Sequence, residues 1–152
     1  MKSIRLRKAK LSDLDILLEF EQGVITYERH FDDTLAEDPI SYYDVNQMII
    51  SDEIELLVAE YNGELVGSGY ARIELPKPYL KHKLYSYLGF MYVKPNFRGN
   101  GIIGLIIDEL KKWSISKGIS EIRLDVYANN IAAIKAYEKS GFDAHLLNMR
   151  IK

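Results

Sequence analysis

One short segment constrains the fold of this chain more than any other, because three glycines lie within six residues just ahead of an apolar, helix-like run. Gly99, Gly101 and Gly104 follow a strand-like stretch that ends at Val93. Each glycine in a helix costs about 1 kcal/mol relative to alanine, so the cluster needs a compensating role. A helix that begins on glycines leaves backbone N–H groups free, and its dipole favours an anion there. The segment therefore predicts a phosphate-binding loop between a strand and a helix.

The rest of the chain predicts a mixed pattern of helices and strands around this loop. Before the loop we expect strands over 3–8, 55–61, 64–75 and 83–93 and helices over 12–28 and 39–51. From the loop onward we expect helices over 99–117 and 130–140 and strands over 121–126 and 142–151. Ser12 is expected to cap the first helix, Asn62-Gly63 to form a hairpin turn, and Gly89 to mark a bulge. With no internal repeat or linker, residues 1–152 are predicted to form a single α/β domain.

Composition limits the chemistry that is open to the chain. Its 152 residues, 47% of them hydrophobic, are enough to bury the core of one domain. The absence of cysteine excludes disulfides and thiolate catalysis. The three histidines, His30, His82 and His145, are too dispersed to predict a metal site. No signal peptide or membrane-spanning run is visible, so we expect a cytoplasmic protein that does not bind membranes.

The charges are unevenly distributed although the net charge is only −2. Residues 11–71 carry fifteen acidic side chains and one basic side chain, whereas residues 72–152 carry fourteen basic and seven acidic ones. Such an asymmetry points to charged partners rather than to a particular fold. Nucleic acid is not the expected partner, because the chain is net acidic and lacks both a clustered basic helix and a stacking motif.

Two general phosphate-binding motifs fit the glycine loop incompletely. A P-loop needs a lysine and a hydroxyl residue after its last glycine, where this chain has Leu105 and Ile106. The dinucleotide fingerprint Gly-x-Gly-x-x-Gly matches, and Asp125 follows about 20 residues later. However, residues 95–98 separate the strand from the first glycine, and only 48 residues follow Gly104. A dinucleotide-binding protein therefore stays the weaker alternative.

Including the arginine at position 98 gives a more specific interpretation. The pattern R-x-x-G-x-I over 98–103, entered from a strand that ends V-x-P, resembles the coenzyme A loop of the GNAT (GCN5-related) N-acetyltransferases. A second stretch over 126–142, V-x-x-x-N-x-x-A-x-x-x-Y-E-K-x-G-F, resembles the second conserved block of that family. The expected order of elements is also similar over essentially the whole chain. The resemblance implies a GNAT-like fold, with a mixed central sheet of about six to seven strands flanked by about four helices.

The resemblance also implies which residues bind acetyl-CoA, the expected acyl donor. The loop amides would bind the coenzyme A pyrophosphate, and the backbone of the preceding strand would bind the pantetheine arm and supply an oxyanion donor. Asn130 would contact the cofactor from the start of the next helix. The expected cofactor-binding residues are Met91, Val93, Arg98, Gly99, Asn100, Gly101, Ile102, Ile103, Gly104 and Asn130. The chain departs from the family at Ile103, where glycine or alanine is usual.

By the same resemblance, Tyr137 is expected to protonate the departing thiolate. A phenol with a pKa of about 10 can donate a proton to a thiolate with a pKa of about 8.5. Many relatives carry a catalytic carboxylate on the strand before the loop, whereas this chain has glycine and phenylalanine at 89–90. The residue that deprotonates the amine is therefore left open between Glu28 or another acid of the first half, Tyr85 or Tyr87, and a chain of waters.

Together these features predict an acyl-CoA-dependent N-acyltransferase that transfers acetyl to a primary amine by direct attack in a ternary complex. The acidic first half predicts a cationic acceptor, either a small molecule or a protein amine. The missing strand carboxylate motivates one alternative, a non-catalytic module that binds acyl-CoA. An exposed final strand would allow a homodimer to form by sheet pairing.

Overall fold

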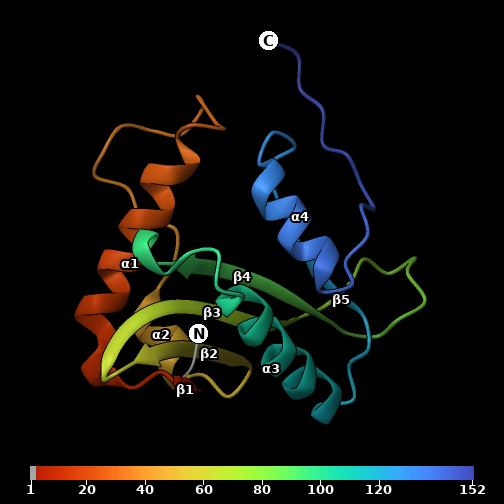
Figure 1. Cartoon of the computed structure of the whole chain (residues 1–152). Helices are drawn as coiled ribbons and strands as arrows, with labels where there is room; N and C mark the ends of the chain where they lie inside the picture. Colours follow the sequence, from red (N-terminus) through yellow and green to blue (C-terminus); the bar gives the residue numbers. More distant parts are fainter. Residues whose placement is uncertain (1–2) are drawn as a thin grey trace.

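A mixed sheet organises residues 3–152, the part of the chain that the computed structural model describes (Figure 1). Its strands follow one another in the order β1 (Ile4–Lys8), β2 (Ile54–Tyr61), β3 (Glu64–Glu74), β4 (Tyr85–Val93) and β5 (Ile122–Leu124). The first four strands are antiparallel neighbours, and β5 pairs with β4 in parallel. The helices are α1 (Leu14–Glu28), α2 (Val45–Ile50), α3 (Ile102–Ser116) and α4 (Ile131–Lys139). The predicted fold class, a mixed sheet flanked by helices, is confirmed.

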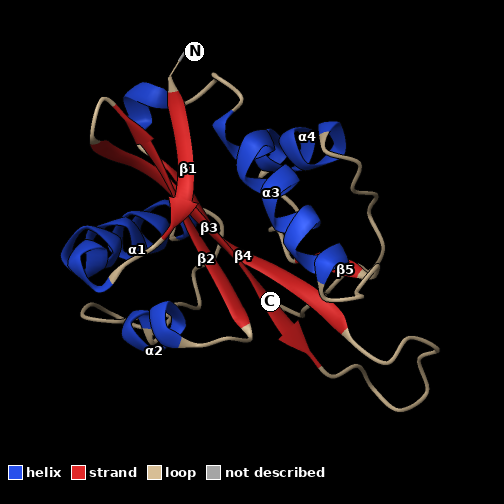
Figure 2. Ribbon diagram, turned by 90° about the horizontal axis from the view of Figure 1, so that it is seen from below, coloured by secondary structure: helices blue, strands red, loops and turns tan. Residues whose placement is uncertain are grey.

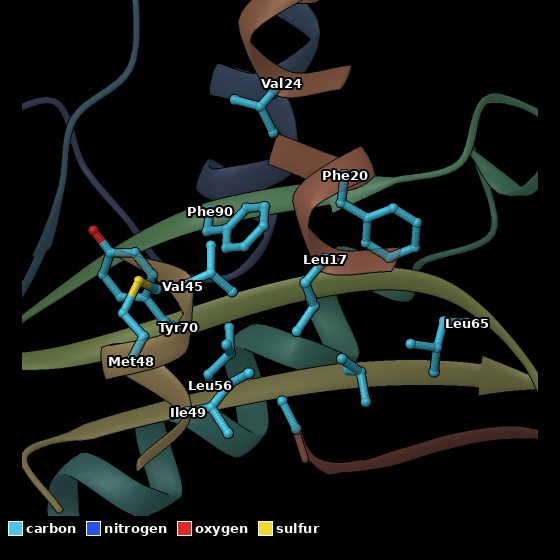
Figure 3. Close-up of a cluster of buried hydrophobic side chains, with 12 residues drawn as sticks. Leu17, Phe20, Val24, Val45, Met48, Ile49, Leu56, Leu65, Tyr70 and Phe90 are labelled. Carbon is cyan, nitrogen blue, oxygen red and sulfur yellow. The ribbon is translucent and has the colours of Figure 1, made fainter. Parts of the chain in front are cut away.

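Helices cover both faces of this sheet, as the continuous apolar sequence of β2 requires. Leu56 and Val58 pack in a cluster with α1 and α2, whereas Leu57 and Ala59 pack in a second cluster with α3. Successive side chains of a strand point to opposite faces, so a strand buried on both sides reads as an unbroken apolar run. Figure 2 shows α1 and α2 on one side of the sheet and α3 and α4 on the other. Figure 3 shows the first cluster, to which α1 contributes Phe20 and β4 contributes Phe90.

The sheet opens between β4 and β5 at the end that leads into the glycine loop. Parallel pairing covers only Ser86 to Leu88 of β4 against Ile122 to Leu124 of β5. Just beyond, β4 bulges where Ser68 pairs with Tyr92 but Tyr70 pairs with Gly89, and Phe90 has a φ of 55°. The bulge thus lies directly after Gly89, the residue that was predicted to mark it. The remainder of β4 leaves β5, which creates space between the two segments.

The C-terminal segment differs from the sequence-based prediction. We expected a strand over 142–151, but residues 143–152 leave the sheet as an extended, unpaired arm (Figure 1). Leu147, Met149 and Ile151 alternate along this arm and are 67%, 82% and 98% exposed. The neighbouring edge strand β5 has only three residues, too few to hold a partner of this length. Within residues 3–152 the sheet therefore has five strands instead of six to seven.

The second helix is also shorter than predicted, because side chains hold the chain ahead of it in a non-helical form. The Glu21 carboxylate is buried and accepts hydrogen bonds from the backbone N–H groups of Tyr42 and Tyr43, both at 2.7 Å. Asp44 then caps the helix through the N–H of Gln47 at 3.1 Å. The expected helix over 39–51 thus begins only at position 45.

Asp13, and not the predicted cap Ser12, holds the short turn that leads into α1. Asp13 is buried, accepts a hydrogen bond from the backbone N–H of Lys10 at 2.8 Å, and pairs with the guanidinium of Arg7 at 2.8 Å. Farther along, Gly23 lets this helix approach β4, because a Cβ there would lie 2.7 Å from the Tyr92 ring. This close packing brings the C-terminal end of α1 to the opened part of the sheet.

Candidate functional site

A cavity of about 650 Å³ occupies the space where β4 and β5 separate. This volume lies within the usual range for small-molecule sites. Ten of the eleven predicted site residues line it: Met91, Val93, Arg98, Gly99, Gly101, Ile102, Ile103, Gly104, Asn130 and Tyr137. Asn100 does not, because its side-chain amide donates to the carbonyls of Phe97 at 3.0 Å and Arg98 at 3.3 Å within the loop. The predicted residues therefore converge on one cavity. We call the part of the cavity whose wall is the glycine loop the donor end.

The glycine loop presents backbone N–H groups to this donor end. Gly99 and Gly101 have φ values of 79° and 76°, a left-handed conformation that side chains disfavour, and open space lies around both. Gly101 is the N-cap of α3, and within residues 3–152 no side chain caps this helix start. The N–H groups of its first turn therefore remain available for an anion. Gly104 itself lies inside the first turn of α3.

Basic side chains make the donor end suitable for a phosphate-bearing ligand. The Nε of Arg98 donates to the Val93 carbonyl at 2.9 Å, and its guanidinium lies over the rings of Tyr27 and Tyr92. This fixes the loop against the end of β4. Lys135 and Lys139 of α4 line the same cavity. Free N–H groups, open glycines and three cations fit the pyrophosphate of coenzyme A.

The bulge in β4 orients one further backbone donor. The Phe90 carbonyl accepts a hydrogen bond from the buried Ser68 hydroxyl at 3.0 Å, on the β3 side of the strand. The C=O and N–H of a trans peptide point in opposite directions, so the Met91 N–H points away from β3. Met91 lines the cavity on that side. Its N–H is therefore oriented for the predicted contact with a developing oxyanion.

Tyr137 of α4 lines the same cavity. Its ring packs edge-on against Phe142 with centroids 6.1 Å apart. Burial, with a smaller effect from the charge of Glu28, raises the pKa of Tyr137 to about 12. The hydroxyl therefore keeps its proton at neutral pH, as a general acid must. Lys111 of α3 holds this helix in place through a hydrogen bond to the Ser140 carbonyl at 3.0 Å.

Asn130 makes a helix-capping hydrogen bond that was not predicted from the sequence. Its side-chain oxygen accepts the N–H of Ala133 at 3.3 Å and so caps α4. Its amide nitrogen is not used by that bond. The predicted cofactor contact of Asn130 can therefore involve its NH₂ group while its oxygen positions the helix that carries Tyr137.

A second part of the cavity, which we call the acceptor end, is lined by Glu28 and Tyr127, whereas Tyr27, which also lines the cavity, contacts Arg98 of the donor end. The Tyr127 hydroxyl donates to Asp32 at 2.6 Å, and its ring stacks on Phe31 with centroids 6.2 Å apart. These contacts join the loop after α1 to the segment after β5. Sequence reasoning missed the aromatic residues here, because only the acidity of the first half indicated this wall.

Of the groups left open as the proton acceptor, Glu28 lines the cavity and Tyr85 and Tyr87 do not. The Tyr87 hydroxyl donates to Asp125 at 3.1 Å. Burial, together with the charge of Asp125, raises the pKa of Tyr87, so this phenol is a poor base. Burial also raises the pKa of Glu28. The Tyr42 hydroxyl opposes this rise, and the charge of Asp32 adds to it.

Two further structural observations concern metals and membranes. Across residues 3–152 we find no group of three or more His, Asp or Glu side chains arranged to hold a metal ion. In the same part of the chain, none of the helices combines the length and the apolar character needed to cross a membrane.

Comparison with known protein sequences identifies relatives. An acetyltransferase of Pectobacterium atrosepticum is 36% identical over 100 residues, which are 66% of this chain and 65% of that protein. An acetyltransferase of Sodalis glossinidius is 32% identical over 125 residues, 82% of this chain and 81% of that protein. The chain thus spans slightly less than two thirds of the first relative and about four fifths of the second.

Solved structures share the fold at lower sequence identity. The crystal structure of a predicted acetyltransferase with acetyl-CoA from Clostridium acetobutylicum has a TM-score of 0.77 and 21% identity, and covers 99% of this chain and 96% of its own. An aminoglycoside antibiotic 6′-N-acetyltransferase from Acinetobacter haemolyticus has a TM-score of 0.74 and 14% identity, with 97% of each chain covered. At these identities the likeness shows the fold alone.

The sequence profile of the acetyltransferase (GNAT) family matches residues 23–142, which include both ends of the cavity and every predicted site residue. Together with the two acetyltransferase relatives, this match confirms the expected family and the expected type of enzyme. The chain belongs to the acetyltransferase (GNAT) family.

Proposed function

We propose that the protein transfers an acetyl group from acetyl-CoA to a primary amine, with both substrates bound in the same cavity. The observation that carries this proposal is the arrangement of that cavity. Its donor end offers free N–H groups and cations, its acceptor end offers a carboxylate and aromatic rings, and Tyr137 lines the same cavity. The amine attacks the thioester directly, since the chain has no cysteine to carry the acetyl group on a thiolate. Residues 1–152 act as one catalytic domain in the cytoplasm.

The acceptor is a cationic amine, either a small molecule or a protein amine. Glu28 and Asp125 line the cavity, and Asp32 lies next to it through its bond with Tyr127. Aromatic faces and carboxylates together attract alkylammonium groups. A solved structure with this fold, an aminoglycoside antibiotic 6′-N-acetyltransferase, offers a parallel.

A thiol-release assay tests the proposal. The protein is mixed with acetyl-CoA and a panel of diamines, aminoglycosides, lysine peptides and neutral or anionic amines, and free coenzyme A is followed with a thiol reagent. We expect turnover that favours the cationic amines. Binding of coenzyme A without turnover on any amine would instead support a non-catalytic module. Binding of NAD without binding of coenzyme A would support the dinucleotide alternative.

The exposed C-terminal arm supports the expectation of a homodimer. Its apolar face, Leu147, Met149 and Ile151, has the period of a strand, and the outer edge of β5 is free within residues 3–152. We expect arms from two copies to pair, since an exposed apolar strand tends to find a partner. Light scattering of the full chain should give the mass of a dimer, and removal of residues 144–152 should give a monomer. An unchanged mass after truncation would contradict this.

A further inference from the structure

The site described so far lacks an assigned group to take a proton from the acceptor. An alkylammonium group has a pKa of about 10.4, so it must lose a proton before its nitrogen can attack a thioester. The bulged part of β4 offers only Gly89 and Phe90 near the reacting position. Among residues 3–152, the acidic side chains that line the cavity are Glu28, Asp108 and Asp125. Their surroundings differ, and this difference identifies one of them.

Asp108 and Asp125 do not have the environment of a base. Asp108 is exposed on α3, on the donor side of the cavity. Asp125 is also exposed and accepts a hydrogen bond from Tyr87 at 3.1 Å, so its charge is stabilised by solvent and by that hydroxyl. A well-solvated carboxylate has little tendency to take a proton at neutral pH.

Glu28 is the half-buried member of the three and the last residue of α1. The groups that face it come from every neighbouring element. They are Asp32 from the following loop, Tyr42 and Tyr43 from the segment before α2, Tyr127 from the segment after β5, and Tyr137 from α4. The charge of Asp32, which has the same sign, also acts on Glu28. The Tyr42 hydroxyl lies beside the carboxyl and is buried without a well-formed hydrogen bond to any residue from 3 to 152.

We propose that Glu28 is the general base of the reaction and takes a proton from the acceptor ammonium at the acceptor end of the cavity. This inference rests on the proposed function. The Glu28 side chain is half-buried and lines the cavity that Tyr137 also lines. The base and the acid of the reaction therefore come from α1 and α4, on opposite sides of the opened sheet.

The proton and electron balance of the step is complete with these two residues. One proton passes from the ammonium to Glu28, and the freed lone pair forms a bond to the carbonyl carbon. As the C–S bond breaks, its electron pair leaves on sulfur, which takes a proton from the Tyr137 hydroxyl. Tyr137 regains a proton from the newly acylated nitrogen, and Glu28 returns its proton to water. The net reaction yields the amide, free coenzyme A and one proton.

The environment of Glu28 suits this role. Burial and the like charge of Asp32 raise its pKa, and the Tyr42 hydroxyl opposes this rise by stabilising the charge. A raised pKa makes the carboxylate a stronger base, although one that loses its charge sooner as the pH falls. Transfer should therefore weaken at acidic pH as Glu28 becomes protonated.

The substitution Glu28→Gln tests the proposal, with Glu19→Gln as a matched control on the exposed face of the same helix. Using the best amine from the assay panel, we expect E28Q to lower kcat about 100-fold and to remove the acidic limb of the pH profile. E19Q, which removes the same charge, should behave like the original protein. With trifluoroethylamine, which is largely neutral at the assay pH and needs no base, the loss should be much smaller. Glu28→Asp should keep the pH dependence at a lower kcat.

Two results would overturn the assignment. E28Q could keep its kcat and pH profile, or it could raise only the KM for charged amines, which would make Glu28 a binding residue. Unaltered coenzyme A binding by E28Q serves as the check on its fold, since the donor end does not include this residue. If the unmodified protein transferred acetyl to no amine at all, the proposed function would fail first, and the role of Glu28 with it.

Discussion

The two ends of the cavity are built in different ways. The donor end consists mainly of backbone N–H groups in one continuous loop, supported by Arg98, whereas the acceptor end consists of side chains from α1, the loop after it and the segment after β5. Backbone recognition needs glycines at fixed spacing, which a sequence displays directly. Side-chain recognition from separate segments leaves no such pattern. The first end is therefore suited to a constant ligand, and the second can vary with the acceptor.

The largest effect is expected at the donor end. Gly101→Glu should weaken coenzyme A binding at least about 100-fold, because it places a negative charge where the phosphates would lie. Gly118→Glu is a matched control, since Gly118 has the same φ of 76° and open surroundings but lies at the far end of α3. Isothermal titration calorimetry measures both. Equal losses in the two variants would mean that backbone strain, and not the phosphate site, explains the effect.

The next largest effect is expected from substitution of Tyr137, and it should appear in kcat. Tyr137→Phe removes the proposed proton donor and should lower kcat by about 100-fold while coenzyme A binding changes little. Because the pKa of Tyr137 is raised to about 12, the original enzyme should lose activity only at strongly alkaline pH from this group. Tyr85→Phe, outside the cavity, is the control for loss of a phenol. A Y137F enzyme with full kcat would assign the proton donor elsewhere.

The smallest effect is expected at the acceptor end. Asp32→Asn should raise the KM for a cationic amine about 2- to 5-fold and leave the KM for acetyl-CoA unchanged, since an exposed charge pair contributes little. Asp33→Asn removes a charge from the next residue, whose carboxylate pairs with Arg150 at 3.3 Å. Steady-state kinetics with both substrates separates the two variants. If D32N and D33N behaved alike, the acceptor end would attract the cationic amine only through its overall negative charge.

The difference between the two ends also explains which features could be predicted from sequence. The loop, the hairpin at Asn62-Gly63 and the bulge near Gly89 each depend on a few adjacent residues with special backbone conformations. Their local sequence was sufficient. The delayed start of α2 was not predictable, because it depends on the carboxylate of Glu21, about twenty residues earlier in the chain.

The features that were missed, or only partly predicted, depend on contacts between segments that are distant in the sequence. Tyr127 and Phe31 come together from distant segments, so no local pattern marks them as one wall. The alternation of Leu147, Met149 and Ile151 correctly describes an extended segment, but pairing also needs a partner strand, and β5 is too short. The unequal charge of the two halves was informative in a coarse way. The acidic half supplies Glu28 to the cavity and the basic half supplies three cations, but the basic half also supplies Asp108 and Asp125, so the asymmetry did not identify which acidic residue matters.

The most direct test of this account is a crystal structure of the protein with coenzyme A and the best amine from the panel. We predict that the pyrophosphate lies on the N–H groups of residues 99–104, with the sulfur next to the Tyr137 hydroxyl and the amine nitrogen facing Glu28. A pyrophosphate bound away from this loop, or an amine bound on the other side of the sheet, would contradict the account.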